Sequence, residues 1–146
     1  MNIIVLAYKF PPFKGVGARR ITSLVKSLSH LGVSIDVITV DWGDVPVDIK
    51  SMKNVTLHII PSNYLHKLHY SIDFKGSYFH RIFRLLYVRF FQLTYCWDDE
   101  ASLWRRPLLK KVDSVIKNKN SQILLATGHP FQVNYLAALV KKKILI

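Results

Sequence analysis

The segment from Ile3 to Arg20, IIVLAYKFPPFKGVGARR, decides the fold of this chain. Its first residues are an apolar run typical of a buried strand, a loop with two glycines follows, and an amphipathic helix opens near Ala18. A strand, a glycine-containing loop and a helix in this order place backbone N–H groups and the positive end of a helix at the carboxyl edge of a sheet. Such an edge suits a phosphate group or a sugar ring.

The rest of the chain continues the alternation of helix and strand. One apolar helix face, at the i, i+3, i+4, i+7 spacing typical of a buried side, is expected from Ile21, Leu24, Val25, Leu28 and Leu31. Gly32 follows where a left-handed helix end is expected. Strands joined by helical crossovers predict an α/β fold: a single Rossmann-like domain with a mainly parallel sheet flanked by helices. The further strands are expected over residues 35–40, 55–60 and 122–126, and the further helices over about 78–95, 103–117 and 131–142.

Three segments between these elements carry weaker signals. Residues 63–76 are polar and aromatic, which indicates a long loop. The acidic run at 98–100 favours the start of a helix, because carboxylates stabilise its positive end. Residues 144–146, ILI, look like the beginning of another strand, which suggests a fragment of a longer protein.

The charge balance points to an anionic partner. The chain has 21 Lys and Arg against 9 Asp and Glu, a formal net charge of +12. An excess of this size is typical of proteins that meet nucleic acid, a membrane surface or phosphorylated substrates, although a solvated basic surface is the ordinary alternative.

The compartment follows from what the sequence contains. Cys96 is the single cysteine, so an internal disulfide framework is excluded and a reducing compartment is favoured; we expect this residue to be a small buried hydrophobe. The N-terminus has the pattern of a strand rather than of a signal peptide, and no run is apolar enough for a membrane span. We expect a cytoplasmic protein, with peripheral contact at the inner face of the membrane as a further possibility.

The first loop does not match a dinucleotide fingerprint. Gly15 and Gly17 supply two of the three glycines, but Arg20 stands where the third is needed, and the loop is longer than the usual tight turn. Asp41 does follow the second strand, where a ribose-binding acid would lie. Two alternatives therefore stay open. The chain can be a nicotinamide or flavin enzyme, or the two glycines can serve only to permit a turn.

Two groups of polar residues follow strands and are candidates for a binding site. Arg19 and Arg20 lie in the first turn of a helix, where cations are unfavourable, so an anionic ligand or a solvated basic face has to account for them. At the other strand end, Thr127-Gly128-His129-Pro130 precedes the last helix. His129 can hydrogen-bond a substrate hydroxyl or phosphate, or simply cap that helix.

The remaining motifs are less specific. His66 and His69 lack a nearby cysteine or acid, so no metal site is expected, and neither a serine nucleophile elbow nor a Walker lysine motif is present. Residues 80–95, HRIFRLLYVRFFQLTY, mix arginines with aromatic and aliphatic residues. A helix of this composition can lie on an anionic membrane or pack against a partner domain.

Three separated motifs together resemble one known family. The opening strand with its glycine loop and GARR, the stretch ASLW at 101–104, and ATGHPF at 126–131 follow the order seen in family-4-type glycosyltransferases of the two-domain GT-B fold. The resemblance implies that residues 1–146 are the N-terminal, acceptor-side Rossmann-like domain. It also implies retaining sugar transfer from a nucleotide-sugar donor to a glycan or lipid-linked acceptor, without a cofactor or an obligatory metal.

The resemblance also assigns residues. It implies a substrate-binding role in the interdomain cleft for Gly15, Gly17, Arg19 and Arg20, with Thr127 and Gly128 beside them. It makes His129 the candidate catalytic residue, in contact with the transferred sugar.

The sequence departs from the family pattern in three places. Gly15-Val16-Gly17 replaces a common Gly-Gly-Gly, Cys96-Trp97 stands where proline is common, and the C-terminal domain with its paired glutamates is absent. The isolated chain is therefore expected to be inactive. The alternative function is a non-catalytic basic α/β module that binds an anionic membrane surface or nucleic acid, although nucleic acid is not expected for a glycosyltransferase.

Overall fold

The computed structural model describes residues 1–62, 78–94, 100–119, 123–128 and 130–144. In chain order the elements are β1 (Asn2–Leu6), α1 (Val16–His30), β2 (Ser34–Val40), α2 (Val47–Lys50), β3 (Val55–Ile60), α4 (Tyr78–Thr94), the short 3-10 helix η1 (Ser102–Trp104), α5 (Arg105–Lys119), β4 (Ile123–Ala126) and α6 (Gln132–Ile144).

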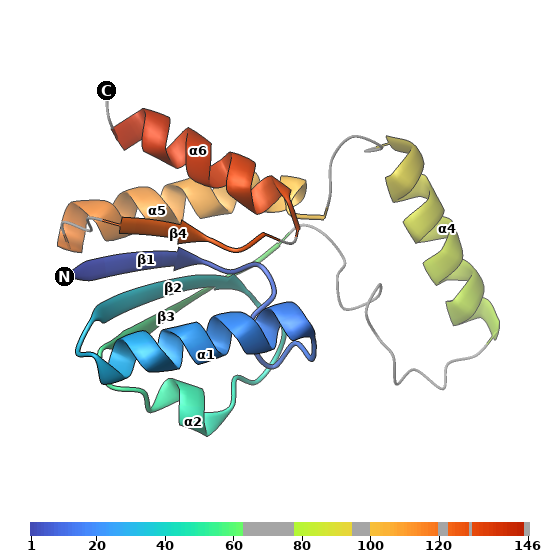
Figure 1. Cartoon of the computed structure of the whole chain (residues 1–146). Helices are drawn as coiled ribbons and strands as arrows, with labels where there is room; N and C mark the ends of the chain where they lie inside the picture. Colours follow the sequence, from blue (N-terminus) through green and yellow to red (C-terminus); the bar gives the residue numbers. More distant parts are fainter. Residues whose placement is uncertain (63–77, 95–99, 120–122, 129, 145–146) are drawn as a thin grey trace.

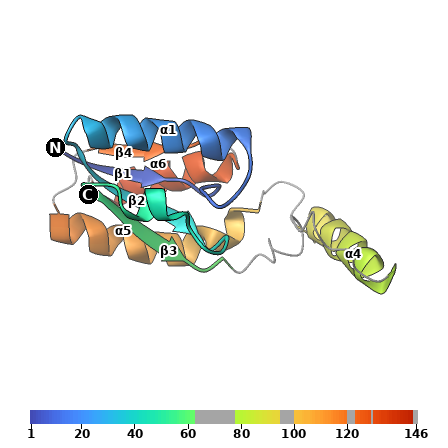
Figure 2. The same ribbon diagram turned by 90° about the horizontal axis from the view of Figure 1, so that it is seen from below.

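The described strands form a parallel sheet in the order β3-β2-β1-β4 (Figure 1). The central strand β1 pairs on one side with β2, where Leu6 lies opposite Ile38, and on the other with β4, where Leu6 lies opposite Ala126. Helices cover both faces of this sheet (Figure 2). The predicted α/β class, a Rossmann-like domain with a parallel sheet flanked by helices, is confirmed.

Alternation along β1 and β2 divides the core into two layers. Ile3 and Val5 pack on one face of the sheet with residues of α1 and α2. Ile4 and Leu6 point to the other face, where they meet η1, α5 and α6. Both faces of these strands are buried, which explains why their sequences are continuous apolar runs rather than alternating ones.

The end of α1 has the backbone geometry that the sequence predicts. Gly32 has a φ of +75°, in the left-handed region that favours glycine. Its N–H donates to the carbonyl of Ser29 at 3.0 Å, and the N–H of Val33 donates to the carbonyl of Leu28 at 3.1 Å. These two hydrogen bonds form a Schellman motif, which turns the chain directly into β2.

Several expectations differ from the structure. Ile144, expected to open a strand, is the last residue of α6. The carboxylate of Glu100, expected at a helix start, pairs with Lys9, and no side chain caps the following helix η1. On α1, the expected core residues Leu24 and Leu31 are exposed, since the buried face runs through Ile21 and Val25. The sequence also did not predict α2.

Other expectations fall outside the described residues. These are the loop at 63–76 with His66 and His69, Cys96, the acids at 98–99, Gln122 and His129. Within the described part of the chain, no helix combines the length and the apolar character needed to cross a membrane.

Candidate functional site

The candidate site lies where the strand order of the sheet reverses. β1 and β4 are neighbouring parallel strands, but the helices that follow them pack on opposite faces: α1 joins one core layer and α6 the other. Connections that leave a sheet in opposite directions open a crevice outside the carboxyl ends of the strands. This is the place where parallel α/β sheets characteristically bind ligands.

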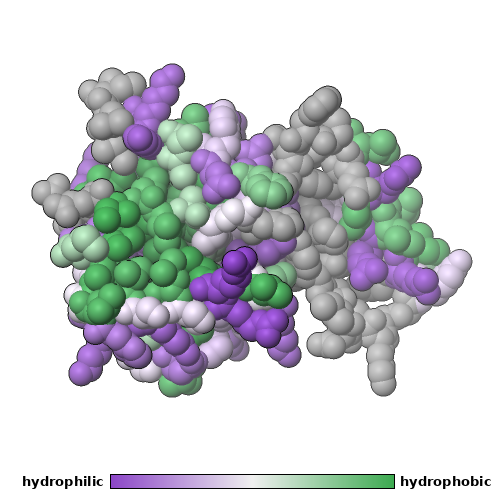
Figure 3. Space-filling view, in the orientation of Figure 1, coloured by the Kyte–Doolittle hydropathy of each residue, from purple (hydrophilic) through white to green (hydrophobic). Residues whose placement is uncertain are grey.

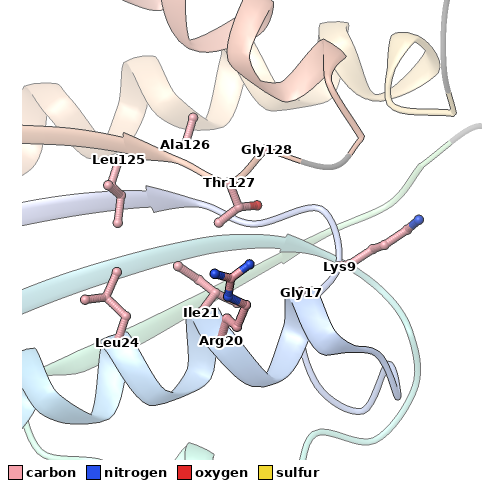
Figure 4. Close-up of a pocket in the computed structure, with 9 residues that line it drawn as sticks. All are labelled: Lys9, Gly17, Arg20, Ile21, Leu24, Leu125, Ala126, Thr127 and Gly128. Atoms are coloured by element: carbon pink, nitrogen blue, oxygen red, sulfur yellow. The ribbon is translucent and has the colours of Figure 1, made fainter.

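A hollow of about 470 Å³ occupies this position. It is bounded by α1 on one side and by β4 with its following turn on the other (Figure 4). Its lining residues are Lys9, Gly17, Arg20, Ile21, Leu24, Leu125, Ala126, Thr127 and Gly128.

The structure thus brings together four of the residues singled out from the sequence. Gly17 and Arg20 come from α1, whereas Thr127 and Gly128 lie more than a hundred positions later in the chain. Gly15 and Arg19 do not line the hollow. His129, which follows Gly128 in the sequence, lies outside the described residues.

Arg20 supplies the hollow with positive charge. Its guanidinium points from α1 toward Thr127 at the end of β4 (Figure 4). Among the residues that the structure describes, no carboxylate forms an ion pair with it. The first turn of α1 adds to this potential, because no side chain caps its N–H groups and it contains no acidic residue.

Gly17 and Gly15 serve different purposes. A Cβ placed on Gly17 would meet no atom within 4 Å, so the fold does not require glycine there, and the backbone of α1 stays open toward the hollow. A Cβ on Gly15 would lie 2.7 Å from Cε1 of Phe13. Glycine at 15 therefore allows the Phe13 ring to lie against the loop, where it also packs on Trp42 with ring centroids 4.7 Å apart.

Lys9 reaches the rim of the hollow, but its charge is already compensated. Its Nζ lies 2.9 Å from Oε1 of Glu100, in a pair whose side chains are only 14% and 8% exposed. The ammonium also lies 5.5 Å from the centroid of the Phe13 ring. In Figure 4 the amine accordingly points away from Arg20 and the other lining side chains.

Tyr8 anchors the loop that carries these residues. It is fully buried, and its ring meets those of Trp42 and Trp104 edge-on at centroid distances of 5.9 and 5.4 Å. Its carbonyl accepts the indole N–H of Trp42 at 2.6 Å, and its hydroxyl donates to the carbonyl of Glu100 at 3.3 Å. The loop after β1 is therefore held from two distant parts of the chain.

The sequence did not single out Lys9, Tyr8 or Glu100 as parts of the site. Lys9 and Glu100 are far apart in sequence, so no local spacing signals their pairing. The sequence places Lys9 in the loop after the first strand and Glu100 at the end of an acidic run, and neither setting marks a buried charge.

Thr127 continues the pairing of β4 with β1 into the turn. Its N–H donates to the carbonyl of Leu6 at 3.1 Å, and its hydroxyl lies 3.4 Å from the same oxygen. The hydroxyl oxygen keeps lone pairs that can accept a hydrogen bond from a ligand. Thr127 and Arg20 thus present an acceptor and a set of donors across one hollow.

Asp41, the residue that a dinucleotide enzyme would need, serves a local turn. Its Oδ1 accepts the backbone N–H of Gly43 at 3.0 Å, and it is not among the residues that line the hollow. Within the described ranges, no group of three His, Cys, Asp or Glu side chains is arranged to hold a metal ion.

Comparisons with known proteins found no relative of this chain, so a function has to be argued from the fold and the site. No family model matches the chain, and no match was found among curated proteins or solved structures. The class defined by the structure is therefore a Rossmann-like α/β domain with a hollow at its topological switch point.

Proposed function

We propose that this chain is the acceptor-side half of a retaining glycosyltransferase, which moves a sugar from a nucleotide-sugar donor to a glycan or lipid-linked acceptor. The observation that carries the proposal is the convergence of Gly17, Arg20, Thr127 and Gly128 on one hollow. These residues belong to two of the three motifs in which the sequence resembles family-4-type glycosyltransferases.

The chemistry of the hollow suits a sugar phosphate. The Arg20 guanidinium and the uncapped N-terminus of α1 favour the negative charge of a phosphate, and guanidinium groups can donate two parallel hydrogen bonds to its oxygens. Thr127 offers a hydroxyl to a neighbouring sugar hydroxyl. The apolar side chains of Ile21, Leu24 and Leu125 provide a floor on which a sugar ring can pack.

The size and openness of the site fit a cleft with a second wall. A volume of about 470 Å³ lies within the roughly 300–1,000 Å³ usual for small-ligand sites. In the two-domain architecture that the sequence resembles, the opposite wall belongs to a C-terminal domain, which carries paired glutamates and most of the nucleotide-sugar contacts. This chain alone would then bind the donor weakly and would not turn it over.

The direct test is ligand binding followed residue by residue. Uniformly ¹⁵N-labelled chain is titrated with UDP, GDP and pyrophosphate, and amide shifts are recorded by NMR. We expect saturable shifts at Gly17, Arg20, Thr127 and Gly128. Arg20→Ala should weaken binding about tenfold or more, because a charge-assisted hydrogen bond contributes about 1.5–3 kcal/mol.

Arg19→Ala is the matched control. It removes the same charge from the same turn of α1, but Arg19 does not line the hollow. A similar loss of binding in both variants would mean that the surface attracts anions without a defined site. Salt-sensitive binding to DNA or anionic vesicles with no response to any of the phosphate compounds would favour a non-catalytic module instead. NAD(H) binding that is lost on Asp41→Ala would favour a dinucleotide enzyme.

A further inference from the structure

Helix α4 stands apart from the α/β body in both ribbon views (Figures 1 and 2). It also exposes a stripe of apolar side chains. Residues at the spacing i, i+3, i+4, i+7, i+11 and i+14 share one face of a helix, within an arc of about 100°. All six such positions are apolar and exposed, from 37% at Ile82 to 79% at Phe79. The stripe consists of Phe79, Ile82, Phe83, Leu86, Phe90 and Leu93.

A stripe of this kind is costly to leave in water. Burying one such side chain is favourable by about 1.5–3 kcal/mol, and contiguous exposed apolar surface marks an interaction site in folded proteins. Figure 3 shows hydrophobic side chains on the surface of α4, interrupted by hydrophilic ones. The stripe therefore requires a partner with a large apolar surface.

The charges of α4 indicate which partner. The helix carries Arg81, Arg84 and Arg89 and no acidic residue. Arg89 borders the stripe next to Ile82, where a guanidinium would lie at the level of lipid headgroups when the stripe is inserted. Arg81 and Arg84 lie on the other side of the helix and add to the attraction toward a negative surface.

We propose that α4 docks in the plane of an anionic lipid bilayer, with its stripe between the acyl chains and Arg89 among the headgroups. The composition is that of interfacial helices: Phe and Leu on one face, arginines elsewhere. The helix is about 25 Å long. No helix in the described part of the chain combines the length and the apolar character needed to cross a bilayer. A second copy of the chain is a poorer occupant, because two bodies with a net charge of +12 repel each other.

Docking would also orient the candidate site. The strands of the sheet point their carboxyl ends toward the side of the molecule where α4 lies, as both ribbon views show (Figures 1 and 2). Membrane-bound α4 would therefore bring the edge that carries the hollow toward the lipid surface. Docking itself does not depend on sugar transfer, so each proposal can fail without the other.

The test is binding of the full chain to 100 nm vesicles, measured by co-sedimentation. We expect binding to vesicles of phosphatidylcholine and phosphatidylglycerol at 7:3, and little binding to phosphatidylcholine alone. Added NaCl should weaken the binding. Arg89→Gln should weaken it about fivefold, since one basic residue near an anionic surface contributes about 1 kcal/mol.

Two neighbouring leucines provide a matched pair of variants. Leu86 lies at the centre of the stripe and Leu85 lies outside it, yet their exposed fractions are similar, 63% and 57%. Leu86→Ser should reduce vesicle binding about tenfold or more, whereas Leu85→Ser should leave it nearly unchanged. Unfolding midpoints measured in both variants separate a docking defect from a folding defect.

Three outcomes would overturn the proposal. The first is equal binding to charged and neutral vesicles, or to neither. The second is an equal effect of the two leucine variants. The third is a dimer in lipid-free sedimentation equilibrium that Leu86→Ser converts to a monomer, which would assign the stripe to contact between copies of this chain.

Discussion

The ammonium of Lys9 and the carboxylate of Glu100 form a largely buried ion pair, 2.9 Å apart, beside the carboxyl end of β1. The pair joins the loop that precedes α1 to the segment that precedes η1 and α5. The hydrogen bond from the Tyr8 hydroxyl to the carbonyl of Glu100 joins the same two segments. The loop that brings Lys9 to the rim of the hollow is thus fixed by contacts with a segment about 90 residues later in the chain.

Breaking this pair on one side should be costly. Glu100→Gln removes the carboxylate from this largely buried pair, and we expect a loss of about 2–4 kcal/mol in the free energy of unfolding. Urea denaturation followed by circular dichroism measures it. The double variant Lys9→Met with Glu100→Gln should recover part of that loss, because the ammonium is removed together with the carboxylate. If the losses in the single variants Lys9→Met and Glu100→Gln add up to the loss in the double variant, the two groups are not coupled.

The two glycines Gly17 and Gly32 should respond oppositely to alanine. Gly17→Ala places a methyl group in open space within a helix, so stability should be retained or rise by up to about 1 kcal/mol. Gly32→Ala forces an L-residue to adopt a φ of +75° and should lose about 1 kcal/mol. Thermal unfolding of both variants gives the comparison, and a destabilised Gly17→Ala would mean that a close contact exists at that position.

The indole of Trp42 should stabilise the loop after β1 through its N–H. Trp42→Phe keeps an aromatic ring but removes the 2.6 Å hydrogen bond to the carbonyl of Tyr8. We expect a loss of about 1 kcal/mol, the usual net value of a hydrogen bond inside a protein. Chemical unfolding of the variant measures this loss. No change in stability would indicate that water replaces the indole without cost.

Asp48 should make a small contribution to the free energy of unfolding that is lost at acid pH. The hydrogen bond from Lys26 to its carboxylate, 3.0 Å long, is the main reason that the pKa of Asp48 lies below its ordinary value of 3.8. Because the folded pKa is the lower one, this contribution is present above pH 3.8 and disappears as the pH falls through the folded pKa. An NMR titration of the carboxyl carbon should show the pKa rising in Lys26→Gln. A midpoint that the substitution does not move would contradict the pairing.

The sequence determined the elements and their order because each rests on short-range patterns. The apolar runs predicted β2 and β3 to within a residue, and Gly32 predicted the end of α1. The four-residue helix α2 was not predicted, because it is too short to show the helical repeat of apolar residues. Leu24 and Leu31 were placed in the core because helical spacing does not reveal how wide the covering sheet is.

The tertiary structure decided which residues form the site. Strand order alone puts β4 beside β1, and this adjacency brings Thr127 and Gly128 opposite Gly17 and Arg20 while leaving Arg19 outside the hollow. The tertiary structure also pairs Lys9 with Glu100. Of the two cations at the hollow, Lys9 therefore stabilises the fold, and Arg20 supplies the charge of the site. Contacts between residues this distant depend on how strands are ordered in space, and no local pattern of apolar or charged residues encodes that order.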